Sequence, residues 1–201
     1  MAIEKKVYDE LFDLSKYDAS WALYPEFDQK PDGMTEFQQN KLWQVINNQY
    51  MILALNPGKK IEKIPWVNFH SNVGTGARRL REVTKHSVLE GCYITDVYKK
   101  IYNAHSTKLQ RFETTRDKVT ASLPILEREL ELLHNPTIIG LGDGVEKFAK
   151  RYLTKYRYIK VFHYSYLGGK DIHMTDEKYY NQWWQNLENS GITRPSAGFQ
   201  H

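Results

Sequence analysis

The stretch ILALNPGKK, residues 52–60, places four apolar residues directly before Asn56-Pro57-Gly58 and two lysines. A short apolar run bounded by turn residues is typical of a strand that is buried on both faces of a sheet. At the end of such a strand, Asn56 can hold a water or a polar group of a ligand. Pro57 fixes the backbone, and Gly58 lets a bulky ligand approach closely. The same three residues also make an ordinary turn, and this stretch alone leaves that alternative open.

Three other short apolar runs are interpreted as strands. The four predicted strands are YMILALN (50–56), CYITDV (92–97), TIIGLG (137–142) and YIKVFHYS (158–165). Helical patterns are predicted from Ile3 to near SKYDAS (15–20), through FQQNKLWQVI (37–46) after a Thr35/Gln38 capping box, from about 74–77, over 113–133, over 144–153, and over 177–189 with Asp176 as the cap. Strands that alternate with helices predict an α/β fold, a three-layer α/β/α sandwich with a central, mainly parallel four-stranded sheet.

Length and composition favour one domain. With 201 residues, 41% of them hydrophobic, the chain is long enough for one core and short for two. We divide the domain 1–201 into an N-terminal helical segment 1–49, a core 50–190 and a C-terminal tail 191–201.

Cysteine usage and the N-terminus indicate the setting. The only cysteine, Cys92, excludes an intramolecular disulfide, a cysteine-rich zinc site and a four-cysteine iron–sulfur cluster, and favours a reducing, cytoplasmic setting. The N-terminus has no apolar segment of the export type, and no run is long enough to span a membrane. We therefore expect an unexported protein with no membrane partner.

Charge and aromatic content suit a polyanionic partner. The formal net charge is +4, and 13% of the residues are aromatic. Several rings stand beside cations, as in KKIYNAH and EKYYNQWWQN. Rings can stack on bases while cations meet phosphates, which favours a nucleic-acid surface. The alternative is a core and rim that happen to be rich in tyrosine.

Polar clusters follow each predicted parallel strand. Ligands of such sheets bind beyond the carboxyl ends of the strands, where loops gather. The clusters at these ends are Asn56-Pro57-Gly58, Asp96, Gly142-Asp143-Gly144 and His163-Tyr164-Ser165. The sequence therefore predicts a site at this edge.

Other motifs give no competing site. His70, His105 and His173 lack metal-ligand spacing, and Asp143 with His163 lacks a serine or cysteine nucleophile in an elbow context. GLGDG lacks the third glycine of the dinucleotide fingerprint. We expect neither a metal nor a cofactor.

An ordered set of motifs resembles the uracil-DNA glycosylase superfamily. LNPG after the first strand is followed in order by WVNFH, YITDVYK, TIIGLGDGVEKF and HYSYLGG, over about residues 50–168. The first motif is most similar to that of the mismatch-specific uracil/thymine branch. The resemblance implies an enzyme of base excision repair that hydrolyses the N-glycosidic bond of a deaminated or mismatched base flipped out of DNA. We expect a monomer with DNA as its partner.

The resemblance also assigns roles to residues. His163 would donate a hydrogen bond to the oxyanion that develops on the departing base, and Asn56 would orient the attacking water. Pro57 and Gly58 would line the base site. Phe69 would be the platform on which the base stacks, with Trp66 as the second candidate.

DNA contacts follow from the same resemblance. Tyr166 and Leu167, just past His163 and Ser165, would fill the space that the flipped base leaves. The cations expected near phosphates are Lys59, Lys60, Arg78, Arg79 and Lys170.

Two positions depart from the family pattern. Asp96 stands where the family usually has an asparagine that reads uracil. An ionised Asp96 would oppose the O4 carbonyl of uracil and favour an amino group, whereas a protonated one could still serve uracil. Alternatively, Asp96 faces elsewhere, as a helix cap or the partner of an arginine. The second departure is HYSY in place of His-Pro-Ser-Pro, which lacks two stiffening prolines.

These departures leave two other functions open. One is a catalytically inactive nucleic-acid-binding module of the same fold, and the other is an N-glycosidase that acts on free nucleosides or nucleotides.

Overall fold

The computed structural model of the chain describes residues 3–24, 42–57, 64–70, 75–99, 101, 116–166, 174–196 and 198–199. Within these ranges, none of the helices has both the length and the apolar character needed to cross a membrane.

The centre of the fold is a five-stranded sheet with the order β1-β3-β2-β4-β5. Its strands are β1 Ala19–Trp21, β2 Tyr50–Ala54, β3 Tyr93–Asp96, β4 Thr137–Leu141 and β5 Tyr158–Val161. β2 runs parallel to β3 and β4, and β4 runs parallel to β5, which confirms the four predicted strands. β1 pairs with β3 in the antiparallel direction at the edge, and sequence analysis missed it. Its three residues are too few to show a period of two.

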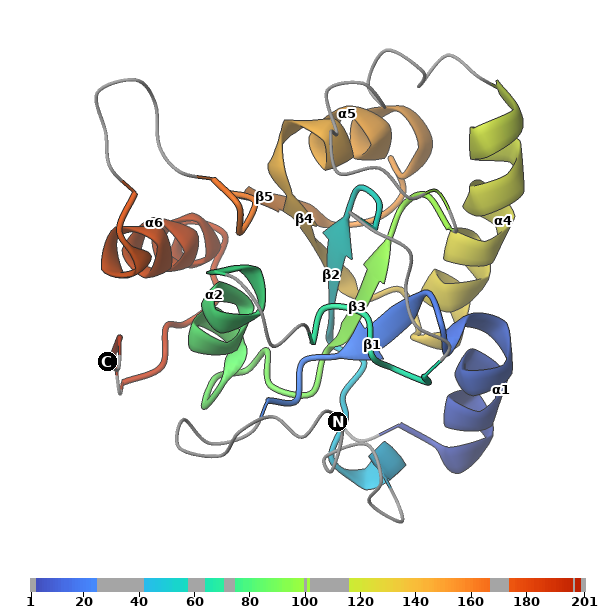
Figure 1. Cartoon of the computed structure of the whole chain (residues 1–201), viewed down its shortest axis with the longest axis horizontal. Helices are drawn as coiled ribbons and strands as arrows, with labels where there is room; N and C mark the ends of the chain where they lie inside the picture. Colours follow the sequence, from blue (N-terminus) through green and yellow to red (C-terminus); the bar gives the residue numbers. More distant parts are fainter. Residues whose placement is uncertain are drawn as a thin grey trace.

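Helices cover both faces of this sheet, which confirms the three-layer α/β/α sandwich (Figure 1). α2 (Thr75–Thr84) and α6 (Asp176–Glu188) pack together on one face. α1 (Lys5–Ser15), α4 (Arg116–Leu132) and α5 (Gly142–Tyr152) lie on the other.

Alternating strand residues supply two separate hydrophobic cores. Met51 and Leu53 of β2 belong to the core under α4 and α5, whereas Ile52 and Ala54 belong to the core under α2 and α6. This alternation follows from the two-residue period of a strand. It also shows which strand residues share a face, and the candidate site depends on this.

One predicted helix start is corrected, and another lies outside the described residues. The Thr35/Gln38 capping box lies outside the described residues, and the described part of FQQNKLWQVI contains only the short 3-10 helix η2, Leu42–Gln44. The cap of α6 is Thr175, whose hydroxyl accepts a hydrogen bond from the Lys178 N–H, so the prediction of Asp176 was wrong. Asp176 is instead the first helical residue and pairs with arginines of α2.

A buried ion pair joins α4 to the segment that follows β3, on the α4 side of the sheet. Lys99 Nζ donates to both carboxylate oxygens of Glu129, at 2.9 and 2.8 Å. The same carboxylate accepts from the Tyr93 hydroxyl at 3.0 Å, and Lys99 also contacts the Thr95 hydroxyl. A buried charge is tolerated only when it is paired in this way.

Candidate active site

Strand register brings the first and last polar clusters to one edge of the sheet. Leu53 of β2 is level with Gly140 of β4, and Gly140 is level with Lys160 of β5. Asn56 and His163 each come three residues beyond this level, past the ends of β2 and β5, and β4 separates the two strands. Two strand spacings span roughly 10 Å, a distance that a single nucleobase and a water can fill.

The neighbours of His163 and Asn56 define their local geometry. Gly142, at φ +82°, lies so close that a Cβ added there would stand 3.4 Å from the Cβ of His163. The Asn56 side-chain amide is partly buried and donates to the Pro57 carbonyl at 2.9 Å. Pro57 itself is buried.

Hydrogen bonds fix the tautomer of His163. The Ser165 backbone N–H donates to His163 Nδ1 at 3.2 Å, and the Ser165 hydroxyl lies 2.7 Å from the same nitrogen. Because a backbone N–H can only donate, Nδ1 is the acceptor, and we assign the ring proton to Nε2. Burial lowers the pKa of His163 to about 4. The imidazole is therefore neutral at pH 7 and offers one donor, Nε2–H.

Asp96 lies at the end of β3 with its side chain on the α2 and α6 side of the sheet. Ile94, two residues before it, belongs to that core, and Ala54 is its neighbour in register. Asp96 is 1% exposed. Oδ2 accepts a hydrogen bond from Asn68 Nδ2 at 2.9 Å, whereas the buried Oδ1 has no hydrogen-bond partner among the described residues.

This environment favours the protonated form of Asp96. Burial raises the pKa of the carboxyl to about 7, against the hydrogen bond from Asn68 and the charge of Lys99, which lower it. Because Asn68 donates to Oδ2, the proton is best placed on Oδ1. Oδ1 therefore donates a hydrogen bond when the carboxyl is protonated, below about pH 7, and accepts one when it is ionised, above about pH 7. Among the described residues, Asp96 neither caps a helix nor pairs with an arginine, and its hydrogen bond is to Asn68.

Asn68 connects Asp96 to Phe69. Its amide donates to both Asp96 Oδ2 and the Asp18 carbonyl, and its oxygen accepts from the Phe69 N–H at 3.1 Å. Phe69 adopts φ +67°, a conformation that is rare for a residue with a Cβ and often marks a functional position. Its partly buried ring packs on the α2 and α6 core, on the same side of the sheet as Asp96.

Tyr164 contacts His163 and is within electrostatic range of Asp96. Its ring centroid is 4.1 Å from that of His163. Burial and, secondarily, the Asp96 charge raise the pKa of the Tyr164 hydroxyl. Asp96 therefore lies close enough to this ring to act on it electrostatically, which connects the ends of β3 and β5.

Trp66 belongs to the protein core. Its indole is 1% exposed, packs edge-on against Phe12 and Trp21, and donates to the Tyr8 hydroxyl at 3.1 Å. No face of the ring is left for a base, so the second candidate platform is withdrawn and Phe69 is kept.

The predicted DNA contacts are placed in part. The side chains of Ser165 and Tyr166 are exposed, and Tyr166 stacks on Phe162 with 4.9 Å between centroids. Arg78 is half exposed and pairs with Asp176. Arg79 is buried and donates only to groups inside the protein, so its prediction as a phosphate contact was wrong. The residues that lie outside the described part are Gly58, Lys59, Lys60, Leu167 and Lys170.

Sequence reasoning missed Asn68 and the internal role of Arg79. WVNFH contains Asn68 next to the predicted platform, but a single amide in a loop gives no sign of its partners. Arg79 is one of three arginines among residues 78–81, a pattern that suggests a charged surface. In the described residues, no group of three or more His, Cys, Asp and Glu side chains could hold a metal ion.

The fold is an α/β/α sandwich, and its candidate ligand site lies beyond the carboxyl ends of the parallel strands, as is usual for such sheets. The sequence profile of the uracil DNA glycosylase superfamily matches residues 39–188. This match covers most of the chain, and the chain therefore belongs to that superfamily, whose members act on DNA. The search of curated proteins returned no match.

Proposed function

We propose that this protein hydrolyses the N-glycosidic bond of a deaminated or mismatched base that has been flipped out of DNA. The observation that supports this proposal most directly is the buried Oδ1 of Asp96, which has no hydrogen-bond partner in the described part of the chain. It lies on the face of the sheet that also carries Phe69, and within electrostatic range of Tyr164, whose ring contacts His163. A buried polar atom without a partner is costly, so a ligand that supplies one is bound favourably.

His163 stabilises the leaving group. Glycosidic cleavage builds positive charge on the sugar and negative charge on the departing base. A neutral imidazole whose Nε2–H points at the base carbonyl donates a hydrogen bond to the developing oxyanion. The ring already carries this donor before the reaction begins. The Ser165 N–H and hydroxyl at Nδ1 keep this tautomer in place.

Asn56 positions the water that attacks the sugar. Its amide is held against the Pro57 carbonyl, which restricts the side chain at the lip of the sheet. An amide orients water by hydrogen bonding but takes no proton. We therefore expect slower turnover than a carboxylate at this position would give.

Asp96 reads the edge of the base that faces away from the sugar. When protonated, Oδ1 donates to a carbonyl such as O4 of uracil or O6 of hypoxanthine. When ionised, it accepts from an exocyclic amino group. Because its pKa is about 7, uracil and hypoxanthine are the substrates expected on the acidic side of neutrality.

The experiment is incubation of the protein with single- and double-stranded oligonucleotides that contain uracil, hypoxanthine or a G·T mismatch, at pH 6 and pH 8. Alkaline cleavage then detects abasic sites. We expect strand breaks at uracil or hypoxanthine, more at pH 6, and few with His163→Ala.

Two outcomes would replace this proposal. Salt-dependent DNA binding without abasic sites on any substrate would indicate a nucleic-acid-binding module. Release of base from free nucleosides or nucleotides, with little affinity for DNA, would indicate a small-molecule N-glycosidase.

A further inference from the structure

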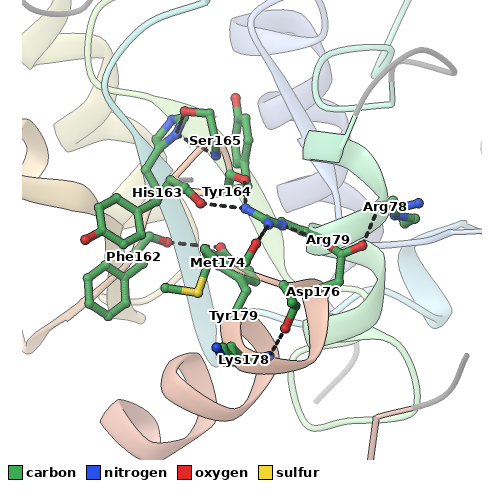
Figure 2. Close-up of polar contacts among 12 residues, drawn as sticks. Arg78, Arg79, Phe162, His163, Tyr164, Ser165, Met174, Asp176, Lys178 and Tyr179 are labelled. Atoms are coloured by element: carbon green, nitrogen blue, oxygen red, sulfur yellow. Dashed lines mark hydrogen bonds and ion pairs between the residues drawn. The ribbon is translucent and has the colours of Figure 1, made fainter. Parts of the chain in front are cut away.

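The loop after β5 carries His163, and one buried arginine, Arg79, donates hydrogen bonds to its backbone carbonyls. Arg79 of α2 is 2% exposed. Its Nη1 donates to the carbonyl oxygens of Tyr164 at 2.9 Å and Tyr166 at 2.7 Å, the residues on either side of Ser165. Figure 2 shows the guanidinium between this loop and the start of α6.

The remaining contacts of Arg79 lock its orientation. Nε donates to Asp176 Oδ1 at 2.8 Å, and Nη2 donates to the Met174 carbonyl at 2.8 Å. The guanidinium also lies over the Tyr179 ring, 4.9 Å from its centroid. These contacts leave the planar Arg79 guanidinium little freedom, so the N–H groups that face the loop keep a fixed direction.

One peptide unit connects Arg79 to the imidazole. The Tyr164 carbonyl and the Ser165 N–H belong to the same planar peptide, in which the two groups point in opposite directions. Arg79 holds the carbonyl, and the N–H donates to His163 Nδ1. A rotation of this peptide would remove the hydrogen bond that keeps the ring proton on Nε2.

The rest of the loop backbone is held in a similar way. The Phe162 carbonyl accepts from the Tyr179 hydroxyl at 3.0 Å and from Trp183 Nε1 at 3.2 Å. The His163 carbonyl accepts from the Tyr166 N–H at 2.8 Å. The Tyr164 and Tyr166 carbonyls are both bound by Arg79. This part of the loop, HYSY, contains no proline, so its backbone is restrained by these hydrogen bonds.

We propose that Arg79 is a positioning residue that orients the 164–165 peptide and thereby holds His163 as the Nε2–H tautomer. It acts through the loop and touches neither base nor sugar. The inference rests on the proposed function for its effect on base excision, but its effect on His163 stands independently of any activity.

The test is NMR titration of His163 in protein labelled with ¹⁵N-histidine, for wild type and Arg79→Met. In the wild type we expect an Nε2–H tautomer that stays neutral to low pH. In Arg79→Met we expect mixed tautomers and a His163 pKa that moves toward its ordinary value by about one pH unit or more. The single-turnover excision rate should fall about tenfold or more, with DNA affinity unchanged.

Controls separate positioning from folding and from the proposed activity. Arg128→Met removes an exposed arginine of α4 and should change neither readout. Arg79→Lys keeps a cation beside Asp176 but loses the fork, so we expect the same changes at smaller size. A folded Arg79→Met with wild-type His163 titration overturns the inference. If Arg79→Met does not fold, wild-type titration in Arg79→Lys overturns it. If the wild type excises no base, the proposed function fails while the titration still decides this inference.

Discussion

At the scale of single residues, the candidate site depends on which polar atoms are satisfied and which are open. Asn68 uses its two N–H donors and its oxygen on Asp18, Asp96 and Phe69. Asp96 Oδ1 is then the carboxyl oxygen without a hydrogen-bond partner in the described part of the chain. The identity of residue 96 was readable in the sequence, but its protonation depends on burial and on Asn68, which only the folded chain brings together.

The pH dependence of stability tests the state of Asp96. The pKa of this carboxyl is raised from its ordinary value of 3.8 to about 7, so the folded protein binds the proton more tightly. The stability that this gives is fully present below about pH 4 and is lost as pH rises through about 7. Asp96→Asn has no such dependence. We therefore expect Asp96→Asn to become more stable than wild type as pH rises from 5 to 8, by urea denaturation.

The comparison between variant and wild type isolates Asp96. His70 and His163 have lowered pKa values of about 4, and their contributions have the opposite sign, since they are lost as pH falls. They are common to both proteins and cancel in the difference. A difference in the free energy of unfolding that stays constant from pH 5 to 8 would contradict a raised pKa for Asp96.

The same substitution tests base reading. Asp96→Asn keeps a donor at every pH, so its rate of uracil release should stay level from pH 6 to 8. The wild-type rate should fall up to about tenfold for each pH unit above 7, because only the protonated fraction donates. Rates are measured under single-turnover conditions at constant ionic strength. Parallel pH profiles would show that Asp96 does not read the base.

At the scale of elements, the sequence predicted best the short apolar strands that are buried on both faces of the sheet. Four apolar runs predicted the parallel strands. Strands that are buried on both faces are apolar throughout, so the local sequence is enough to identify them. β1 has only three residues and forms by pairing with the edge of β3. It therefore depends on a tertiary contact that the local sequence does not show. The residue type of Asp176 predicts a cap, but the hydroxyl of Thr175 performs that role and Asp176 pairs with Arg79 of α2.

The cap of α6 gives a direct prediction. Thr175→Ala removes the oxygen that accepts the Lys178 N–H. We expect a loss of about 1 kcal/mol in the free energy of unfolding. Chemical denaturation measures it, and Thr154→Ala, in an exposed turn, is the matched control. Equal stabilities for the two variants would show that the cap contributes little.

The ion pair between Lys99, just after β3, and Glu129 of α4 gives another prediction. Glu129→Gln leaves the Lys99 ammonium buried without its counter-charge, and we expect a loss of about 3–5 kcal/mol. The double variant Lys99→Met with Glu129→Leu removes both charges and should recover much of that loss. Urea denaturation of the three proteins measures the coupling, and a double variant less stable than Glu129→Gln would contradict this account.

At the scale of the whole molecule, net charge and the placement of the site agree with a DNA partner. The chain carries a formal charge of +4, and Arg78 is half exposed on α2, whose next residue, Arg79, holds the His163 loop. Replacement of a cation that contacts a phosphate lowers the salt dependence of binding by a fixed increment. Replacement of a distant cation does not.

Salt titration of DNA binding tests this placement. For single-stranded DNA, Arg78→Gln should reduce the slope of log K against log salt concentration by about 0.7. Arg128→Gln, on the α4 side of the sheet and paired with Glu10, should leave the slope unchanged. The reverse result would place the DNA on the other side of the molecule.

The central claim is that Asn56 and His163, from the first and last parallel strands, act on one extruded base. The most direct measurement is the single-turnover rate of abasic-site formation in a uracil-containing oligonucleotide, for wild type, Asn56→Ala and His163→Ala at pH 6. The account predicts measurable wild-type excision and a loss of about 100-fold or more in each variant, with DNA affinity retained. Excision by either variant at the wild-type rate would contradict it.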